Sequence, residues 1–149
     1  MIEVISEIKT RLEVILAGEL FDDPAGGDSL AMVSLGGLAP KRSGAQNDED
    51  FPFVVVRSMT GSDSDRNSGC SVHILAGIFT DGNIVAGLTD IDRLVGLVCS
   101  LRENRFVAGH RLLQDISWRY GDKDGLQQDP YYYATIALEF TRDKKCTEV

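Results

Sequence analysis

The sequence has few of the side chains that most often hold metals or act as nucleophiles. It contains two histidines, His73 and His110, and three cysteines, Cys70, Cys99 and Cys146. Three cysteines cannot all pair, and none of their spacings matches a C-x-x-C metal or redox motif. A closed zinc site needs four ligands, and Cys70 with His73 supplies only two. We therefore expect no metal site and a protein that works in a reducing compartment.

Long apolar runs and an excess of positive charge are also missing. No stretch approaches the roughly 20 apolar residues that cross a bilayer, and the first residues carry acids where a signal peptide needs lysines. The 15 Lys and Arg are outnumbered by 23 Asp and Glu, which gives a formal net charge of −8, and they are scattered between the acids. This balance argues against a nucleic-acid-binding surface. We expect no membrane partner and no export through a signal peptide.

Two short matches to functional motifs fail on the residues around them. Residues 27–30 (GDSL) match the signature of a serine hydrolase family, but a turn precedes them where a strand must present the nucleophile. Neither histidine lies three residues after an aspartate, as that family requires. Residues 63–67 (DSDRN) match the start of an EF-hand loop, but Ser68 and Ile74 occupy the positions that require glycine and glutamate. The sequence therefore predicts no catalytic residue, no metal and no cofactor.

Hydrophobic periodicity predicts the order of the elements. Apolar residues recur at helical spacing over residues 2–17 and again from Ile84 to about Arg102. β-Branched and aromatic residues predict a strand over residues 51–59, and alternation of side chains between two faces predicts three more, over residues 70–80, 112–120 and 131–141. The order helix, strand, strand, helix, strand, strand predicts an α+β fold, in which two helices pack on one face of an antiparallel sheet of four or five strands.

We expect residues 1–149 to form one domain with a long loop at 21–50, which contains one short strand, and a frayed tail at 142–149. A polar tip at 60–69 joins the first two strands. The core is expected where strand and helix periods agree on one apolar face, which selects Trp118, Ile116, Ile136 and Leu138 in the strands and Leu12, Leu88, Ile91 and Val95 in the helices.

The other face of the predicted sheet is only half polar. It carries Leu75 and Phe79 in one strand and Tyr131 and Tyr133 in another. A neighbouring subunit would cover such residues. A local lid formed by residues 21–50, or apolar residues scattered on the surface, explains them equally well. The Gly-, Ser- and Asp-rich segments at 36–50 and 61–69 offer little apolar surface, so we expect them to be mobile in the isolated subunit and ordered by partners.

The second half of the chain carries a series of features in a fixed order. They are a PFVVVR strand from Pro52 to Arg57, an acidic tip with Asp63 and Asp65, an apolar strand that ends in Gly77-Ile78-Phe79, a helix, and a Q-x-x-P-Y-x-Y lead from Gln127 to Tyr133 into the last strand. Together with the leading helix, this pattern resembles the tail terminator proteins of long-tailed bacteriophages. The resemblance spans about residues 50–142 and concerns residues that pack rather than residues that catalyse.

The resemblance implies a structural protein and not an enzyme. Members form a ring, in the better-known cases a hexamer, which caps the head-proximal end of the tail tube, stops its growth and forms the surface that joins the head. The implied partners are further copies of the chain, the tail tube protein and a head-tail connector or stopper protein, while DNA passes through the ring without specific binding. The implied location is the head-proximal end of the virion tail, after assembly in the host cytoplasm.

These expectations assign two groups of residues. We place Leu75, Phe79, Tyr131 and Tyr133 at the subunit interface, and we place Asp63, Asp65, Asn47 and Asp48 in loops that contact partners. Two alternatives remain open at this point. One is another phage neck protein, a stopper or a head-tail connector. The other is a small cytosolic α+β enzyme or ligand-binding domain, which would need a cleft with perturbed titratable groups.

Overall fold

A computed structural model describes residues 2–36, 50–113, 115–121 and 130–143, and 47% of these residues lie in strands. The helices are α1 (Ile2–Ile15) and α2 (Ile84–Cys99), which continues as a 3₁₀ turn (Ser100–Glu103). The strands are β1 (Leu20–Asp22), β2 (Asp28–Leu30), β3 (Met32–Leu35), β4 (Phe53–Asp63), β5 (Asn67–Phe79), β6 (Phe106–Val107), β7 (His110–Leu112), β8 (Ser117–Tyr120) and β9 (Tyr131–Asp143).

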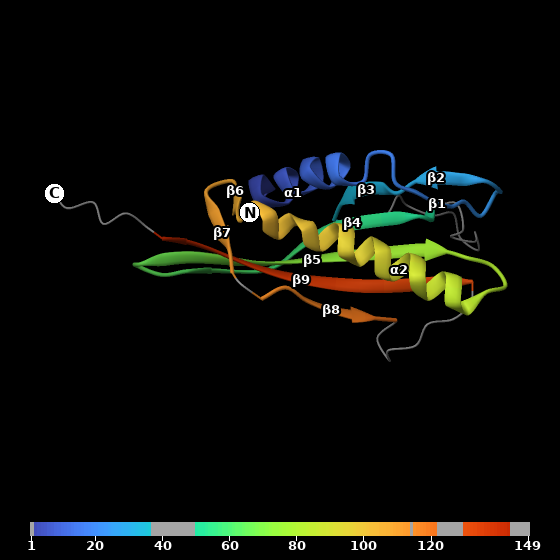
Figure 1. Cartoon of the computed structure of the whole chain (residues 1–149). Coiled ribbons are helices and arrows are strands. Elements are labelled where there is room, and N and C mark those ends of the chain that lie inside the picture. The colour runs from blue at the N-terminus through green and yellow to red at the C-terminus, as the bar shows by residue number, and fades with distance from the viewer. Residues whose placement is uncertain (1, 37–49, 114, 122–129, 144–149) are drawn as a thin grey trace, which may run out of the picture.

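Within the described residues, seven strands form one curled, mixed sheet (Figure 1). Its order is β3-β4-β5-β9-β7-β6, and β8 also pairs with β9. All neighbouring strands are antiparallel except β3 and β4, which run parallel with Met32 beside Phe53. Strands β1 and β2 form a separate antiparallel hairpin.

The predicted antiparallel sheet of four or five strands is therefore wrong. Residues 21–50, expected to be a loop with one strand, contribute β2, β3 and most of β1. These strands are three or four residues long, too short to show a clear alternation in the sequence. The predicted strand at 112–120 is instead divided between β7 and β8, which pair with different stretches of β9.

Both helices cover the same face of the sheet, as predicted. Helix α1 packs on β3 and β4, and α2 packs on β5 and β9. The even-numbered residues of the long strands point toward the helices, so that Val54, Ile74 and Ile136 are completely buried. The predicted helices at 2–17 and 84–102 are confirmed. Helix α2 begins after Asn83, whose side chain accepts a hydrogen bond from the Ala86 amide and so caps the helix.

The β4–β5 hairpin is longer than its sequence pattern indicates. The predicted polar tip at 60–69 consists mostly of strand, and only residues 64–66 form the turn, which Ser64 closes through its hydroxyl to the Asn67 carbonyl at 3.0 Å. Polar residues stay in register here because β9 pairs with β5 as far as Asn67 and Asp143. Strands β4, β5 and β9 consequently run past the ends of the helices (Figure 1).

Trp118 and Leu88 do not lie in the core as predicted, since they are 46% and 43% exposed. Trp118 lies opposite Ile136 and thus faces the helix side, but β8 is an edge strand and α2 packs on β5 and β9. Ile116 is partly buried, whereas the other five residues of the predicted core are buried: Leu12, Ile91, Val95, Ile136 and Leu138.

A glycine in α2 sets how closely this helix approaches β9. A Cβ atom on Gly87 would lie 2.2 Å from ring atoms of the fully buried Tyr132. Because that ring cannot move without disturbing the core, Gly87→Ala is expected to lower the free energy of unfolding by about 1–3 kcal/mol. Gly96→Ala in the same helix meets nothing within 4 Å and is expected to raise it by about 0.5–1 kcal/mol. Urea unfolding of both variants measures the difference, and equal stabilities would contradict this packing.

Candidate interaction surfaces

The sheet face opposite the helices carries a cluster of aromatic and aliphatic side chains, which we call the aromatic face. It consists of Phe51, Phe53, Val55, Leu75, Phe79, Tyr131 and Tyr133. The centroid of the Phe51 ring lies 5.0 Å from that of Phe53 and 5.2 Å from that of Tyr131. The ring centroids of Phe79 and Tyr131 lie 5.8 Å apart. The structure thus brings together all four residues of the predicted subunit interface, and each of them is half-buried.

Gly77 allows the rings to lie close to the backbone of the sheet. A Cβ atom on this residue would lie 2.4 Å from the Phe53 ring and 2.9 Å from the Phe51 ring. Phe51 precedes β4, and its ring packs on Phe53 and Tyr131. A residue of the same chain therefore covers part of the aromatic face. Phe51 and Phe53 also belong to this surface, which was not predicted from the sequence, although a glycine in the middle of a strand is a signal for close packing.

The predicted partner-contact residues lie elsewhere. Asp63 ends β4 and Asp65 is in the turn that follows, and both are exposed at the far end of the hairpin from the aromatic face. Asn47 and Asp48 fall outside the described residues. The structure therefore does not bring the two predicted groups into one site.

Metal-binding and thiol groups form no candidate site among the described residues. No cluster of three or more His, Cys, Asp or Glu in this part of the chain is placed to hold a metal ion. Cys70 and Cys99 are unpaired and buried, and burial raises the pKa of both thiols. No helix in the ranges that the structure describes is long and apolar enough to span a bilayer.

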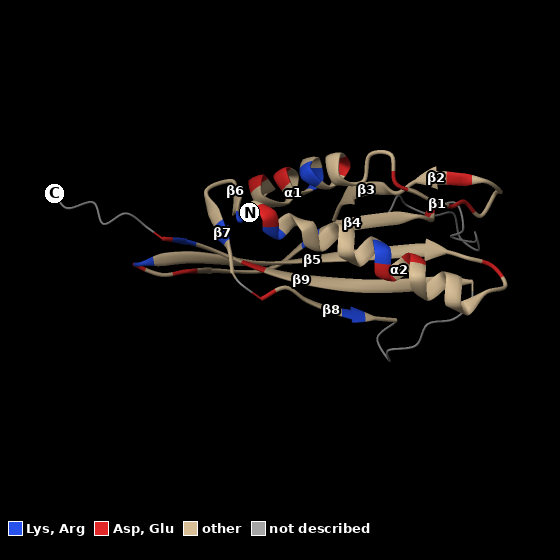
Figure 2. Ribbon diagram, viewed as in Figure 1, with Lys and Arg blue, Asp and Glu red and all other residues tan. Residues whose placement is uncertain are grey.

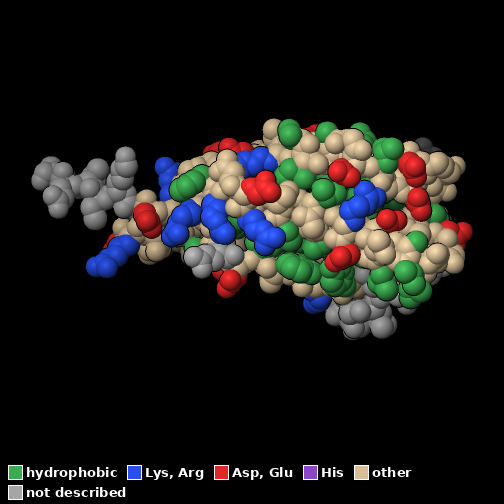
Figure 3. Space-filling view, in the orientation of Figure 1, with side chains coloured by type: hydrophobic (Ala, Val, Ile, Leu, Met, Phe, Trp, Pro, Cys, Tyr) green, Lys and Arg blue, Asp and Glu red, His purple; other side chains and the backbone are tan. Residues whose placement is uncertain are grey.

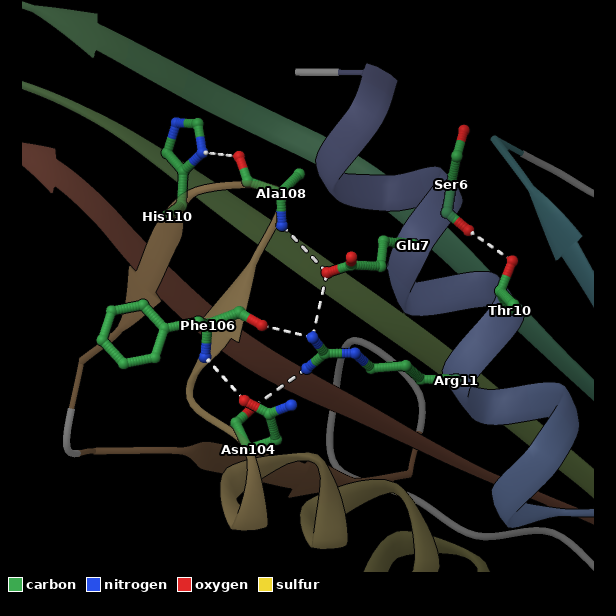
Figure 4. A network of polar contacts seen from close by, with 8 residues as sticks. All are labelled: Ser6, Glu7, Thr10, Arg11, Asn104, Phe106, Ala108 and His110. Atoms are coloured by element: carbon green, nitrogen blue, oxygen red, sulfur yellow. Dashed lines mark hydrogen bonds and ion pairs between the residues drawn. The ribbon is translucent and has the colours of Figure 1, made fainter.

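A polar network holds the β6–β7 hairpin against α1 (Figure 4). Arg11 donates hydrogen bonds to the carbonyl oxygens of Asn104, at 2.9 Å, and of Phe106. Glu7 pairs with Arg11 at 3.0 Å and accepts a hydrogen bond from the Ala108 amide at 2.9 Å. Ala108 has a φ of +48°, a left-handed conformation that is rare for alanine. Two side chains of α1 thus fix a tight turn that lies about a hundred residues later in the chain.

A hollow, which we call the basic hollow, lies beside the β6–β7 hairpin at the end of the molecule where β9 ends. Phe106 points away from the network and is 63% exposed (Figure 4). Beside it lies a depression of about 810 Å³ lined by Ser68, Phe106, Gly109, Arg111, Thr141, Arg142 and Asp143. A Cβ atom on Gly109 would lie 3.7 Å from Cζ of Arg142, so this guanidinium rests against the turn. Within the described residues, neither Arg111 nor Arg142 forms an ion pair.

The charges of the folded chain are therefore not scattered, as the sequence indicates, but partly sorted by position. In the space-filling view, Lys and Arg side chains gather at the end that carries β6 and β7 (Figure 3). Acidic segments mark the opposite end, around β1 and β2 and after β5 (Figure 2). The sequence does not reveal this arrangement, because Arg111 and Arg142 become neighbours only when β7 pairs with β9.

The opposite end carries the β1–β2 hairpin, which we call the acidic hairpin. Asp22 and Asp28 face each other across it, and Leu20 and Leu30 beside them are 50% and 53% exposed. Partial burial, followed by the neighbouring carboxylates of Asp90 and Asp28, raises the pKa of Asp22.

Arg93 of α2 holds this hairpin in place. Its guanidinium lies 4.0 Å from the centre of the Phe21 ring and donates a hydrogen bond to the Leu20 carbonyl at 2.7 Å. It also pairs with Glu19 at 3.2 Å. Phe21 itself is buried in the core, so the hairpin is anchored through both an aromatic side chain and an ion pair.

A smaller groove lies between α2 and β8. Val85, Leu88 and Tyr120 contribute to its lining, and its volume is about 420 Å³. The Tyr120 hydroxyl donates a hydrogen bond to Asp92 of α2. Burial, and then this hydrogen bond to a carboxylate, raise the pKa of Tyr120. Leu88 is exposed in this groove because the edge strand β8 covers only part of α2.

No protein-family model matches this sequence. A comparison with curated proteins also gives no significant match.

Removing the arginine of the network tests its role. Arg11→Met deletes the donor to Asn104 and Phe106 and leaves Glu7 without its cation. We expect a loss of about 1 kcal/mol in the free energy of unfolding and roughly tenfold faster amide exchange in the β6–β7 hairpin. Lys9→Met is the matched control, because among the residues that the structure describes Lys9 pairs only with Glu13, on the exposed side of the same helix. Equal exchange in the two variants would show that the network does not fix the hairpin.

The pKa of Asp22, raised by burial and then by the neighbouring carboxylates, predicts that replacing this residue stabilises the fold in a pH-dependent way. Because the folded protein raises the pKa of Asp22, ionisation of this group costs stability as the pH rises through that pKa. Asp22→Asn is therefore expected to raise the melting temperature at pH 7, by an amount worth a few tenths of a kcal/mol for a largely hydrated group. The gain should vanish below about pH 3, where Asp22 is protonated. Asp65→Asn, in the turn between β4 and β5, serves as the control. A higher melting temperature of Asp22→Asn that persists in acid would show that ionisation of Asp22 is not the cause.

Proposed function

We propose that this chain is a structural protein of a long-tailed bacteriophage, a tail terminator that forms a closed ring on the head-proximal end of the tail tube. The ring stops growth of the tube and offers the surface that joins the head. We expect six copies in the ring. Its partners are then the tail tube protein on one side and a head-tail connector or stopper protein on the other, in the virion and after assembly in the host cytoplasm.

The aromatic face is the observation that carries this proposal. Three of the sequence features that resemble tail terminators, at 52–57, 77–79 and 131–133, lie on neighbouring strands, with Gly77 paired to Phe53 on one side and to Tyr133 on the other. Features that are far apart in the sequence thus build one surface, which supports a role in packing. Both described helices cover the other face of the sheet, so a neighbouring subunit is a suitable cover for the aromatic face.

The arrangement of surfaces also favours a ring. A ring of more than two subunits needs heterologous contacts, in which one surface meets a different surface of the next copy. The described chain has distinct surfaces at its two ends: the aromatic face with the acidic hairpin at one, and the basic hollow at the other. A net charge of −8 per subunit suits an opening through which DNA passes without being bound.

The groups with perturbed pKa values do not favour an enzyme. Asp22, Tyr120, Cys70 and Cys99 have raised pKa values, but they lie in the acidic hairpin, the α2–β8 groove and the core, and not around one cleft. Catalysis by acid and base needs such groups to converge on a substrate. A structural role therefore accounts better for the described residues.

Tube capping tests the proposal directly. Purified protein is added to tail tubes that polymerise from the tube protein of the same phage genome, and the tubes are imaged by electron microscopy. We expect shorter tubes with a ring at one end. Tubes of unchanged length without a ring would overturn the terminator assignment, and a ring that binds a head-tail connector but not the tube would assign the chain to another neck protein.

The aromatic face is tested in the same assay. Phe79→Asp places a charge among the rings and should reduce capping at least tenfold at equal protein concentration, by the usual cost of a charge at a packed contact. Met59→Asp replaces a more exposed apolar residue on β4 outside the aromatic face and should cap normally. Circular dichroism confirms that both variants are folded, and normal capping by Phe79→Asp would remove this face from the subunit contact.

A further inference from the structure

The basic hollow and the acidic hairpin have complementary compositions. The hollow combines an exposed aromatic side chain, Phe106, with two guanidinium groups and one carboxylate, that of Asp143. The hairpin combines exposed leucines with the facing carboxylates of Asp22 and Asp28, and the nearby cation, Arg93, is shared with Glu19 and Asp90. Both surfaces therefore offer apolar area, and the charge on each is opposite in sign to the charge on the other.

The two surfaces lie at opposite ends of the sheet (Figure 1). The hollow lies where β5 begins and β9 ends, and it includes Ser68 and Arg142, which are paired in the ladder. The hairpin lies at the other end, where β1 contacts β5 and where β9 begins. One copy cannot bring its own two ends together across this rigid ladder. A contact between hollow and hairpin therefore has to join two copies.

The structure also holds the hollow in a fixed shape. Arg11 and Glu7 fix the turn at Ala108, and the guanidinium of Arg142 rests against Gly109 of that turn. The left-handed conformation of Ala108 costs free energy that the network offsets. A surface that is held in place before binding loses less entropy on association.

We propose that the basic hollow of one copy binds the acidic hairpin of a second copy, so that subunits join end to end through Arg111 and Arg142 on one side and Asp22 and Asp28 on the other. This inference rests on the proposed function, because it names the contact that closes the ring. The contact is heterologous, and it repeats from each copy to the next. The aromatic face lies at the same end of the sheet as the acidic hairpin but on the opposite face of the sheet, so the two are separate surfaces.

Paired charge reversals test the contact on the full-length protein. The hollow variant carries Arg111→Glu and Arg142→Glu, and the hairpin variant carries Asp22→Arg and Asp28→Arg. Each variant alone opposes like charges at every contact, whereas an equimolar mixture can form alternating contacts in which every pair is again attractive. The control, Arg57→Glu with Arg119→Glu, changes the charge as much as the hollow variant does, at exposed arginines outside the hollow. Sedimentation velocity at up to about 0.5 mM protein measures association.

We expect the wild-type protein to self-associate, with a Kd that rises on adding salt. Each charge variant should weaken association at least tenfold, the control should stay within about threefold, and the equimolar mixture should return to within about threefold of wild type. A wild-type protein that stays monomeric over the whole range would overturn the contact. So would folded variants that associate normally, or a mixture that does not recover.

Tube capping by the same variants distinguishes failure of the contact from failure of the terminator assignment. If wild type associates and both charge variants cap tail tubes as well as wild type, the contact is wrong while the terminator assignment stands. If association follows the charge swap but wild type never caps tubes, the contact stands and the terminator assignment fails. If the hollow variant loses binding of a DNA duplex and keeps its self-association, the hollow binds phosphate groups, and the proposed contact is overturned.

Discussion

The antiparallel ladder between β5 and β9 is the constraint on which the other features depend. It pairs Asn67 with Asp143 at one end and Phe79 with Tyr131 at the other, without a break in register. Because this register is continuous, residues of even number in both strands face the helices and residues of odd number face away from them. The ladder thereby separates the main core from the aromatic face, and its length keeps the two candidate contact surfaces at a fixed distance from each other.

Each face of the ladder is packed by a different means. On the helix side, aliphatic side chains fill the space under α1 and α2, and Gly87 lets α2 approach the buried Tyr132. On the other side, Gly77 leaves space for the rings of Phe51 and Phe53. Glycines thus fix the close approaches on both faces, one in a helix and one in a strand, where any larger side chain would collide with an aromatic ring.

Electrostatics supply a second level of organisation that the total charge conceals. The chain is acidic overall, yet Arg111 and Arg142 meet at one end of the sheet, and Asp22 and Asp28 meet at the other. Side chains of α1 and α2 anchor the elements that carry these charges: Glu7 and Arg11 hold the β6–β7 hairpin through hydrogen bonds to its backbone, and Arg93 holds the β1–β2 hairpin through a hydrogen bond and an ion pair. A subunit with ends of opposite charge has a direction, which is the property that a heterologous assembly requires.

The sequence by itself determined the two helices, the β4–β5 hairpin, the last strand and the alternation that brings Leu75, Phe79, Tyr131 and Tyr133 onto one face, because these are long elements whose periodicity depends only on local geometry. Only the tertiary structure decided the parallel pairing of β3, the division between β7 and β8, the exposure of Trp118 on an edge strand, and the meeting of Arg111 with Arg142. Strands of two to four residues carry no readable period, and the burial of a side chain depends on which element lies above it. Contacts between residues far apart in the sequence are set by how the elements pack, which local patterns do not encode.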